Sequence, residues 1–195
     1  MDRHNDPSYP QRGPWDARLT QACCPKLVPV ETVHENPWFS VRNRGGYFTV
    51  EYRFTHVAIL PVIDDRWVVM VRVKRPVIND IPLEFPAGGA YPGEEPTVAA
   101  ARELGEETGI LIEDLGRFAP MTPIAESSTR IPRLSYFFRL NMSEGEFAAR
   151  SSHDDEISSV ERIPVGDLPG MMNRGTIYVS VSLAMIGLFF SSRLA

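Results

Sequence analysis

The chain has 195 residues, of which 43% are hydrophobic and 23% are charged, a composition typical of a globular protein rather than a disordered one. Its 20 basic and 25 acidic residues give a net charge of −5, which argues against the broad basic face that nucleic-acid phosphates require. We therefore expect no nucleic-acid partner. A chain of this length can bury a hydrophobic core without disulfide bonds or metal ions to stabilise it.

The first 36 residues contain five prolines, a density that forbids long regular elements. We predict an extended N-terminal arm over residues 1–36, with one short strand near residues 26–33 and contacts to its own domain or to a second subunit. The remaining residues, 37–195, are predicted to form one domain. Cys23 and Cys24 are adjacent and close no useful loop. No secretory signal or membrane span is evident, so we expect a cytoplasmic protein.

Residues 47–73 carry the pattern of β-strands. Apolar and polar residues alternate over 47–54, as in a strand with one buried face. Residues 56–63 and 66–73 are apolar runs rich in β-branched residues. Asp64 and Asp65 separate these two runs, which predicts a hairpin.

The following segment predicts a helix from Pro96 to Glu107, with Gly109 as its stop. Beyond it we expect a strand over residues 133–140, a mobile polar loop over 144–155 and a strand over 157–163. A short helix within 165–173 and a buried helix over 177–190 complete the chain. Strands on both sides of one strong helix predict a mixed α/β sandwich.

Three glutamates crowd one side of the predicted helix, since Glu103 lies three residues before Glu106 and four before Glu107. Like charges at this spacing destabilise a helix by roughly 0.2–0.5 kcal/mol per pair, and Arg102 alone cannot neutralise all three. Mg²⁺ prefers oxygen ligands such as carboxylates, and the glycines after Ala87 would let a backbone carbonyl approach the same ion. The residues themselves leave two interpretations open, a solvated acidic face and a metal site.

The glutamates belong to a longer pattern, G-x5-E-x7-R-E-U-x-E-E-x-G-U with U aliphatic, which runs from Gly88 to Ile110. This pattern resembles the Nudix box at every specified position. A chance match in a chain of this size has a probability on the order of one in ten million. The resemblance implies a Nudix hydrolase, which splits a nucleoside diphosphate linked to another group. It also implies an α/β/α sandwich with a mixed sheet and the box as a loop–helix–loop.

The matching positions of the box carry implied roles. The implied ligands of Mg²⁺ or Mn²⁺ are the carbonyl of Ala87 and the side chains of Glu103, Glu106 and Glu107. Glu106 would alternatively hold a metal-bound water, Arg102 would orient the glutamates, and Gly88 would shape the turn beside the substrate. Metal ions withdraw charge from a pyrophosphate and acidify a bound water. We expect this water to attack phosphorus directly, without a covalent intermediate.

The segments that flank the box resemble the ADP-ribose and ADP-sugar pyrophosphatase branch of the family. They are N-P-W-F-S-V at residues 36–41, R-x-x-R-P at 72–76 and L-E-x-P-A-G at 83–88. This likeness implies an ADP-ribose-like nucleoside diphosphate sugar as substrate and a homodimer with shared active sites. Arg75 or Lys74 is expected to bind the phosphates or the terminal sugar, and Glu84 to accept hydrogen bonds from sugar hydroxyls. Phe54 is one of several aromatic candidates for stacking on adenine, or for the core.

In the same branch a late acidic residue before a strand helps to activate the water. Glu156 matches that place best, and Asp155 is the alternative. One departure lies sixteen residues after Gly109, where ADP-ribose hydrolases commonly have proline and this chain has Ala125. It counts against ADP-ribose itself and leaves other nucleoside diphosphate sugars. Two alternatives stay open: another substrate, such as a dinucleoside polyphosphate or an oxidised nucleotide, and a non-catalytic nucleotide-sugar sensor.

Overall fold

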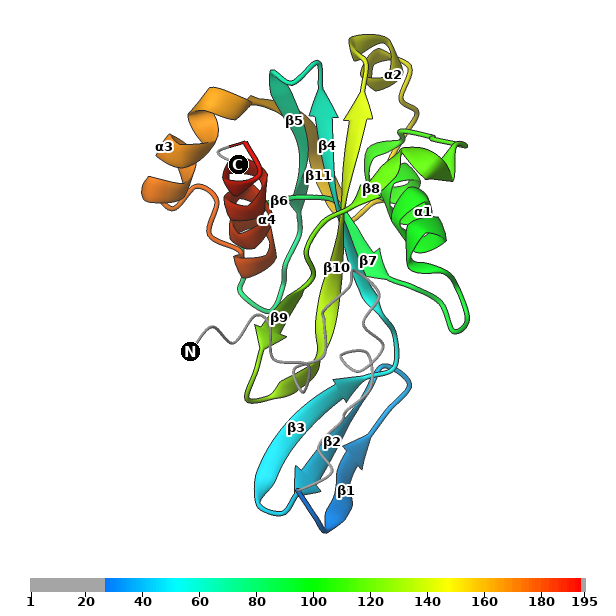
Figure 1. Ribbon diagram of the computed structural model, residues 1–195, viewed down its shortest axis with the longest axis vertical. Coiled ribbons are helices and arrows are strands. Elements are labelled where there is room, and N and C mark those ends of the chain that lie inside the picture. The colour runs from blue at the N-terminus through cyan, green and yellow to red at the C-terminus, as the bar shows by residue number, and fades with distance from the viewer. Residues whose placement is uncertain (1–26, 194–195) are drawn as a thin grey trace, which may run out of the picture.

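The computed structural model describes residues 27–193, which form two β-sheets flanked by helices (Figure 1). The strands are β1 (Val30–Glu35), β2 (Phe39–Arg44), β3 (Tyr47–Tyr52), β4 (His56–Ile63), β5 (Trp67–Val73), β6 (Leu83–Glu84), β7 (Ala87–Gly89), β8 (Phe118–Pro120), β9 (Ile124–Ser127), β10 (Ile131–Met142) and β11 (Ile157–Pro164). The helices are α1 (Pro96–Thr108), α2 (Glu144–Ala148), α3 (Leu168–Asn173) and α4 (Ser180–Ser191), with 3-10 turns η3 (Leu115–Arg117) and η4 (Val165–Asp167). Most of the predicted arm, with Cys23 and Cys24, lies outside the described residues.

The larger sheet has the strand order β11-β5-β4-β10-β8, and the short strands β6, β7 and β9 pair with β5, β4 and β10 respectively. Strands β4 and β10 are parallel, whereas the other pairs in this sheet are antiparallel. A parallel pair needs a long crossover connection, and here that connection contains α1. The predicted mixed sheet is therefore confirmed.

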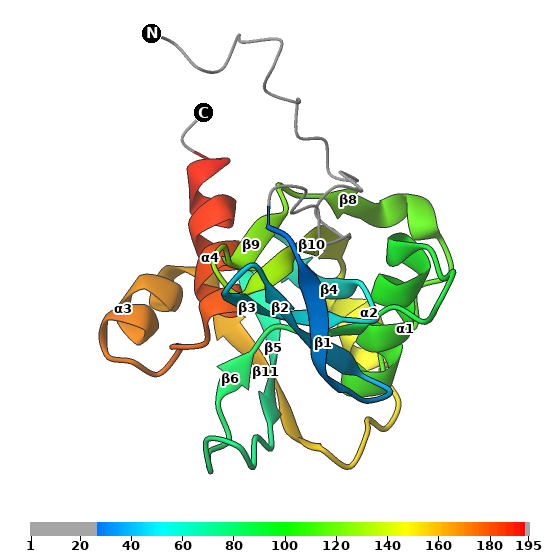
Figure 2. The same cartoon turned by 90° about the horizontal axis from the view of Figure 1, so that it is seen from below.

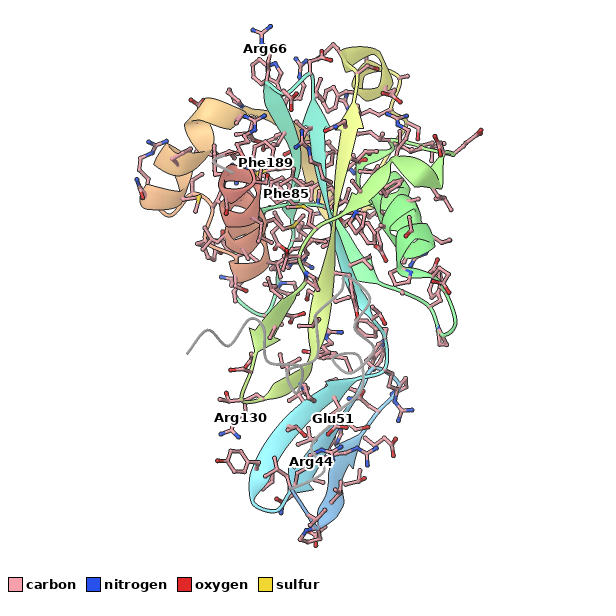
Figure 3. The ribbon with its side chains drawn as sticks, in the orientation of Figure 1. Arg44, Glu51, Arg66, Phe85, Arg130 and Phe189 are labelled. Atoms are coloured by element: carbon pink, nitrogen blue, oxygen red, sulfur yellow. The ribbon has the colours of Figure 1, made fainter. Side chains whose placement is uncertain are left out.

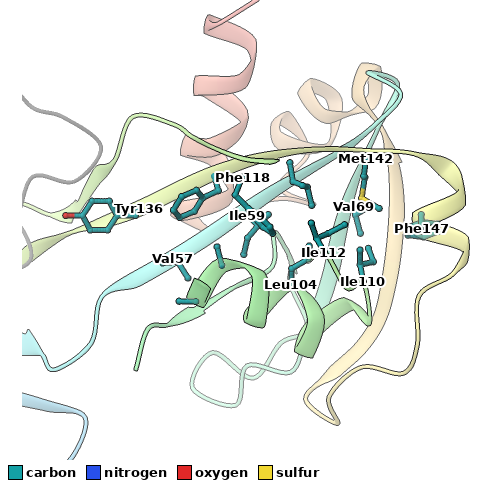
Figure 4. Close-up of a cluster of buried hydrophobic side chains, with 14 of the residues drawn as sticks. Val57, Ile59, Val69, Leu104, Ile110, Ile112, Phe118, Tyr136, Met142 and Phe147 are labelled. Atoms are coloured by element: carbon teal, nitrogen blue, oxygen red, sulfur yellow. The ribbon is translucent and has the colours of Figure 1, made fainter. Parts of the chain in front are cut away.

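Helices cover both faces of the larger sheet, with α1 on one side and α3 and α4 on the other (Figure 1). Alternate residues of β4 face opposite ways, as the pleat of a strand requires. Val57 and Ile59 pack in one buried cluster with Leu104 of α1 (Figure 4). Ala58 and Leu60 pack in the second cluster, beneath α4. The structure is thus the expected α/β/α sandwich.

Helix α4 is the buried C-terminal helix that the apolar run predicts, although it begins at Ser180 rather than at residue 177. Phe189 is fully buried, and Figure 3 shows it on the same side of the sheet as Phe85. The hydroxyl of Ser182 accepts a hydrogen bond from the backbone N–H of Phe85 at 3.1 Å, which ties α4 to the segment before β7. Among residues 27–193, no helix is long and apolar enough to cross a bilayer.

Local patterns predicted the central elements well. The hairpin of β4 and β5 is confirmed, and Asp64 and Asp65 take the left-handed conformation with φ of 49° and 53°. The expectation of a mobile loop over residues 144–155 is wrong in its first part, which is helix α2. Ser143 and Glu146 form a reciprocal capping box that stabilises the start of this helix.

The smaller sheet consists of β1, β2 and β3 and lies at one end of the sandwich (Figures 1 and 2). It is joined to β10 near Arg130, whose carbonyl accepts from the N–H of Val50 and whose guanidinium donates to the carbonyl of Phe48 (Figure 3). The predicted alternation is wrong at the start of β3, where Phe48 is 48% exposed and Thr49 only 5%, whereas Val50 and Tyr52 are half-buried. Thr49 is buried because its hydroxyl donates to Glu51 at 2.8 Å in a polar cluster. The predicted domain boundary after residue 36 falls between β1 and β2.

Candidate active site

Helix α1 positions two acidic side chains against the sheet. Pro96 lies in its first turn, where a missing backbone N–H costs no hydrogen bond, and Gly109 ends it in the left-handed conformation with φ of 71°. Leu104 is fully buried and fixes how the helix is rotated on the sheet. This rotation turns Glu103 and Glu107 inward, so that they are only 9% and 4% exposed.

Strand β7 lies directly against these carboxylates. The backbone N–H of Ala87 donates to Oε2 of Glu107 at 3.0 Å. A Cβ atom placed on Gly88 would lie 2.2 Å from the carboxyl carbon of Glu103, so only glycine leaves room for this contact. The fold therefore brings Ala87, Gly88, Glu103 and Glu107 together, as the sequence predicts.

Arg102 connects the charged members of the pattern. Its Nη1 lies 2.8 Å from Glu103 Oε1 and 2.9 Å from Glu106 Oε2. Its Nε and Nη2 donate to the carboxylate of Glu94 at 3.1 and 3.0 Å, and Nη2 also donates to the carbonyl of Gly89 at 2.8 Å. The spacing within the helix pointed to the pair with Glu106, but the contact with Glu94 comes from the preceding loop. Bonds to these carboxylates raise the pKa of Arg102.

Burial disfavours the charged forms of the two inward carboxylates. Desolvation raises the pKa of Glu107 to about 8, despite the opposing hydrogen bond from the Ala87 N–H. Desolvation also raises the pKa of Glu103, although the hydrogen bond from Arg102 opposes it. Glu106 is more open, with its side chain 41% exposed. Two buried carboxylates with raised pKa values indicate a site that gains stability when a further cation binds.

The predicted substrate-binding residues contact one another. Nε and Nη2 of Arg75 donate to the two carboxylate oxygens of Glu84 at 2.9 and 3.1 Å, a bidentate pair. These bonds to Glu84 raise the pKa of Arg75. Lys74 points elsewhere, because its Nζ donates to the carbonyl of Asp155 at 2.6 Å and its backbone N–H donates to the carbonyl of Glu156 at 2.9 Å. Lys74 therefore holds the loop that carries the late acidic residues.

That loop, residues 151–156, is also attached to the C-terminal end of α1. The N–H of Ser151 donates to the Gly109 carbonyl, and the N–H of Asp154 donates to the Glu106 carbonyl, each at 2.9 Å. A Cβ on Gly109 would lie 2.2 Å from the carbonyl oxygen of Ser151, so glycine is needed here too. The charge of Glu156 contributes to the raised pKa values of both Arg75 and Glu107, so this carboxylate lies near both groups.

The comparison with protein families agrees with this geometry. The NUDIX domain model matches residues 53–180, a span that contains β4 to η4, α3 and the whole charged site. The chain belongs to the Nudix family. The box that its spacing predicts is thus strand β7, helix α1 and the loops on either side.

Relatives of this Nudix chain include curated proteins with stated activities. An ADP-ribose pyrophosphatase of Bacillus subtilis (strain 168) is 28% identical over 122 residues, which cover 63% of this chain and 64% of that protein. An ADP-sugar pyrophosphatase of Mus musculus is 44% identical over 57 residues, covering 27% of this chain and 26% of that protein. A methanol dehydrogenase activator of Bacillus methanolicus is 30% identical over 105 residues, covering 54% and 56%. The match thus spans less than two thirds of the length of these relatives.

The solved structures give the fold. One described as an ADP compounds hydrolase aligns with a TM-score of 0.63 at 20% sequence identity, and the alignment covers 84% of this chain and 91% of that one. At this identity the likeness establishes the shared Nudix fold.

The residues of the Nudix box suit a divalent cation. Within residues 27–193 no three His, Cys, Asp or Glu side chains are gathered so as to hold a metal ion by themselves. Arg102 engages Glu103 and Glu106 in this arrangement. Mg²⁺ needs only one or two carboxylates, because water, a carbonyl and substrate phosphates complete its coordination. The buried carboxylate of Glu107 beside the Ala87 backbone fits that chemistry.

Sequence reasoning missed a buried polar cluster next to the box. His56, Ser135, Glu126 and Arg133 come from three different strands, and no local spacing joins them. Nδ1 of His56 lies 2.8 Å from the hydroxyl of Ser135, which donates to Glu126. Burial lowers the pKa of His56 to about 4. Phe54, a candidate for stacking on adenine or for the core, packs beside this cluster and against Gly89.

Proposed function

We propose that this chain is a Nudix hydrolase that cleaves the pyrophosphate bond of a nucleoside diphosphate sugar. The products would be a nucleoside monophosphate and a sugar phosphate. The observation that carries the proposal is the complete box folded so that Glu103 and Glu107 are buried against strand β7. Relatives named ADP-ribose pyrophosphatase and ADP-sugar pyrophosphatase support the substrate class.

The residues proposed to hold Mg²⁺ or Mn²⁺ are the carbonyl of Ala87 and the carboxylates of Glu103, Glu106 and Glu107. When bound, the metal withdraws charge from the pyrophosphate and acidifies a water molecule. Arg102 keeps Glu103 and Glu106 on the side of α1 that faces β7. Gly88 leaves the space that Glu103 needs.

The remaining proposed roles lie around this centre. Arg75 would bind the phosphates, and Glu84 would orient its guanidinium and accept hydrogen bonds from sugar hydroxyls. Lys74 would act by holding the loop that carries Glu156. Glu156 would accept the proton of the attacking water as a new P–O bond forms. The P–O bond to the bridging oxygen breaks, and its electron pair leaves with the other phosphate.

The proposal is tested by a hydrolysis panel with Mg²⁺, covering ADP-ribose, other nucleoside diphosphate sugars, NADH, dinucleoside polyphosphates and nucleoside triphosphates. Phosphate is detected after coupling to a phosphatase. We expect turnover of at least one nucleoside diphosphate sugar and none in EDTA. Preference for a dinucleoside polyphosphate would reject the substrate class, and no turnover of any compound would reject the enzyme.

A matched pair of variants separates catalysis from stability. Glu103→Gln removes one carboxylate from the box and is expected to lower kcat by about a hundredfold or more while the protein stays folded. Glu113→Gln removes the same charge at an exposed site away from the box and is expected to leave kcat unchanged. Equal rates in the two variants would contradict the assignment.

Three further expectations accompany the proposal. We propose a homodimer, a cytoplasmic location and the division into an arm over residues 1–36 and a domain over 37–195. Light scattering on the purified chain tests the first, and fractionation of cells tests the second. Removal of residues 1–26 tests whether the part before β1 is needed for folding, as judged by thermal unfolding.

A further inference from the structure

Strand β7 is held from two sides. On one side its Gly88 lies against Glu103 of the catalytic helix. On the other side its Gly89 lies against Phe54, because a Cβ on Gly89 would be only 2.6 Å from Cδ2 of the Phe54 ring. A shift of this ring toward Gly89 would therefore push β7 relative to the carboxylates of α1.

Arg133 fixes Phe54 at that position. Its Nη1 donates to the carbonyl of Phe54 at 2.9 Å. The carbon of its guanidinium lies 4.0 Å from the centre of the Tyr52 ring and 5.2 Å from that of Phe54. The two rings lie 5.6 Å apart, so the cation contacts an aromatic pair. A planar guanidinium can donate hydrogen bonds and pack on rings at once, which a lysine cannot do equally well.

The side chain of Arg133 is itself held firmly, since it is only 9% exposed. Glu126 lies 3.3 Å from Nη2 and balances its charge. Glu126 also accepts from Ser135, whose hydroxyl contacts His56 at 2.8 Å. His56 pairs with Gly89 across β4 and β7, so the cluster meets β7 through this strand pairing as well as through Phe54.

This series of contacts leads from Arg133 to the Nudix box. The carbonyl of Gly89 accepts a hydrogen bond from Nη2 of Arg102 at 2.8 Å. We propose that Arg133 is a positioning residue for the Nudix box: through Phe54 it keeps β7 where the strand accepts this bond from Arg102. Arg102 in turn holds Glu103 and Glu106. The inference rests on the proposed function, because it assigns a purpose to the geometry of these carboxylates.

The test measures metal binding without turnover. Mn²⁺ affinity is read by electron paramagnetic resonance in wild type, in Arg133→Met and in Arg130→Met. Arg130 is the matched control, because it lies just before β10 and its guanidinium also donates to a backbone carbonyl, that of Phe48 in β3 rather than that of Phe54. We expect Arg133→Met to bind Mn²⁺ roughly tenfold more weakly, the lower end of the loss that changes of residues around metal ligands cause. We expect Arg130→Met to match wild type.

A second readout follows the guanidinium of Arg102, whose Nη2 donates to Gly89 and whose Nε donates to Glu94. The Nε–H resonance of Arg102 in ¹⁵N NMR spectra should shift in Arg133→Met and stay in place in Arg130→Met. If Arg133→Met does not fold, Arg133→Lys decides, since it keeps the charge but loses the fork that reaches Phe54. We then expect Arg133→Lys to bind Mn²⁺ more weakly than wild type, by a smaller factor than the one predicted for Arg133→Met.

Three results would overturn the inference: equal affinities in all variants, equal losses in Arg133→Met and Arg130→Met, or wild-type affinity in a folded Arg133→Lys protein. Failure of the proposed function has a different signature. In that case wild type would turn over no substrate, whereas the comparison of Mn²⁺ affinities would still decide the role of Arg133.

Discussion

Replacing Glu107 by Gln is expected to stabilise the metal-free protein and to abolish its response to Mg²⁺. In the folded chain burial raises the pKa of Glu107 from the ordinary value of 4.5 to about 8. Because the folded-state pKa lies above the unfolded value, the folded protein binds the proton more tightly, and its stability falls as pH rises between these two values. Near pH 7 the loss of folding stability caused by the raised pKa amounts to about 3 kcal/mol, at about 1.4 kcal/mol per pH unit. A neutral amide of similar shape removes that cost.

Thermal unfolding in EDTA measures the effect at pH 7 and at pH 5. For a chain of this length 1 kcal/mol corresponds to about 2–4 °C in Tm. The new amide nitrogen needs a hydrogen-bond acceptor, which offsets part of the gain, so we expect a rise of roughly 5 °C at pH 7. The rise should shrink at pH 5, because this pH lies close to the unfolded pKa of 4.5 and the cost there is only about 1 kcal/mol. Mg²⁺ should raise the Tm of wild type only. A variant that unfolds below wild type at both pH values would refute the reasoning.

Three other substitutions test separate features of the structure. Gly88→Ala should fold, because its methyl group meets only the end of the Glu103 side chain, but displacing that carboxylate should weaken Mn²⁺ binding about tenfold in a resonance titration. Unchanged affinity would contradict this. Gly109→Ala should lower the free energy of unfolding in urea by at least about 1 kcal/mol. The left-handed conformation disfavours a side chain, and the added methyl group would clash with the Ser151 carbonyl. A variant as stable as wild type would contradict this prediction. The stability of His56→Asn should fall less than that of wild type as pH is lowered. Burial lowers the pKa of His56 from 6.5 to about 4, so the unfolded chain is protonated first and wild type loses about 1.4 kcal/mol per pH unit as pH falls through that range. Parallel loss of Tm in both proteins between pH 7 and pH 5 would argue against it.

Features set by local spacing could be predicted from the sequence. The hairpin of β4 and β5 follows from two apolar runs around Asp64 and Asp65, and α1 follows from its proline start and glycine stop. The contact between Glu103 and Gly88 depends on the box, whose spacing the sequence displays in full. Helix α2 had a readable signal, the capping box at its start, which the polar composition of the segment obscured.

Contacts between distant segments could not be predicted in this way. Arg75 and Glu84 were each expected to meet substrate, and only the pairing of β5 with β6 shows that they meet each other. Lys74 bonds to Asp155, which lies 81 residues later in the chain, and no periodic pattern gives a signal for that contact. The inward Thr49 bonds to Glu51, whose carboxylate is paired with Arg44 of the neighbouring strand β2, and a simple alternation of apolar and polar residues does not anticipate that partner.

The attachment of residues 151–156 to α1 has a consequence for how the protein can change over generations. Besides the 3.3 Å bond from the Ser151 hydroxyl to the Gly109 carbonyl, the bonds from Ser151 and Asp154 to the end of the helix join main-chain atoms. Such bonds do not depend on which side chains the segment bears, so its path past the carboxylates would survive most replacements along it. Substitutions here can thus change the side chains beside the proposed site without altering the scaffold, which makes this segment a natural place for related chains to diverge in substrate preference.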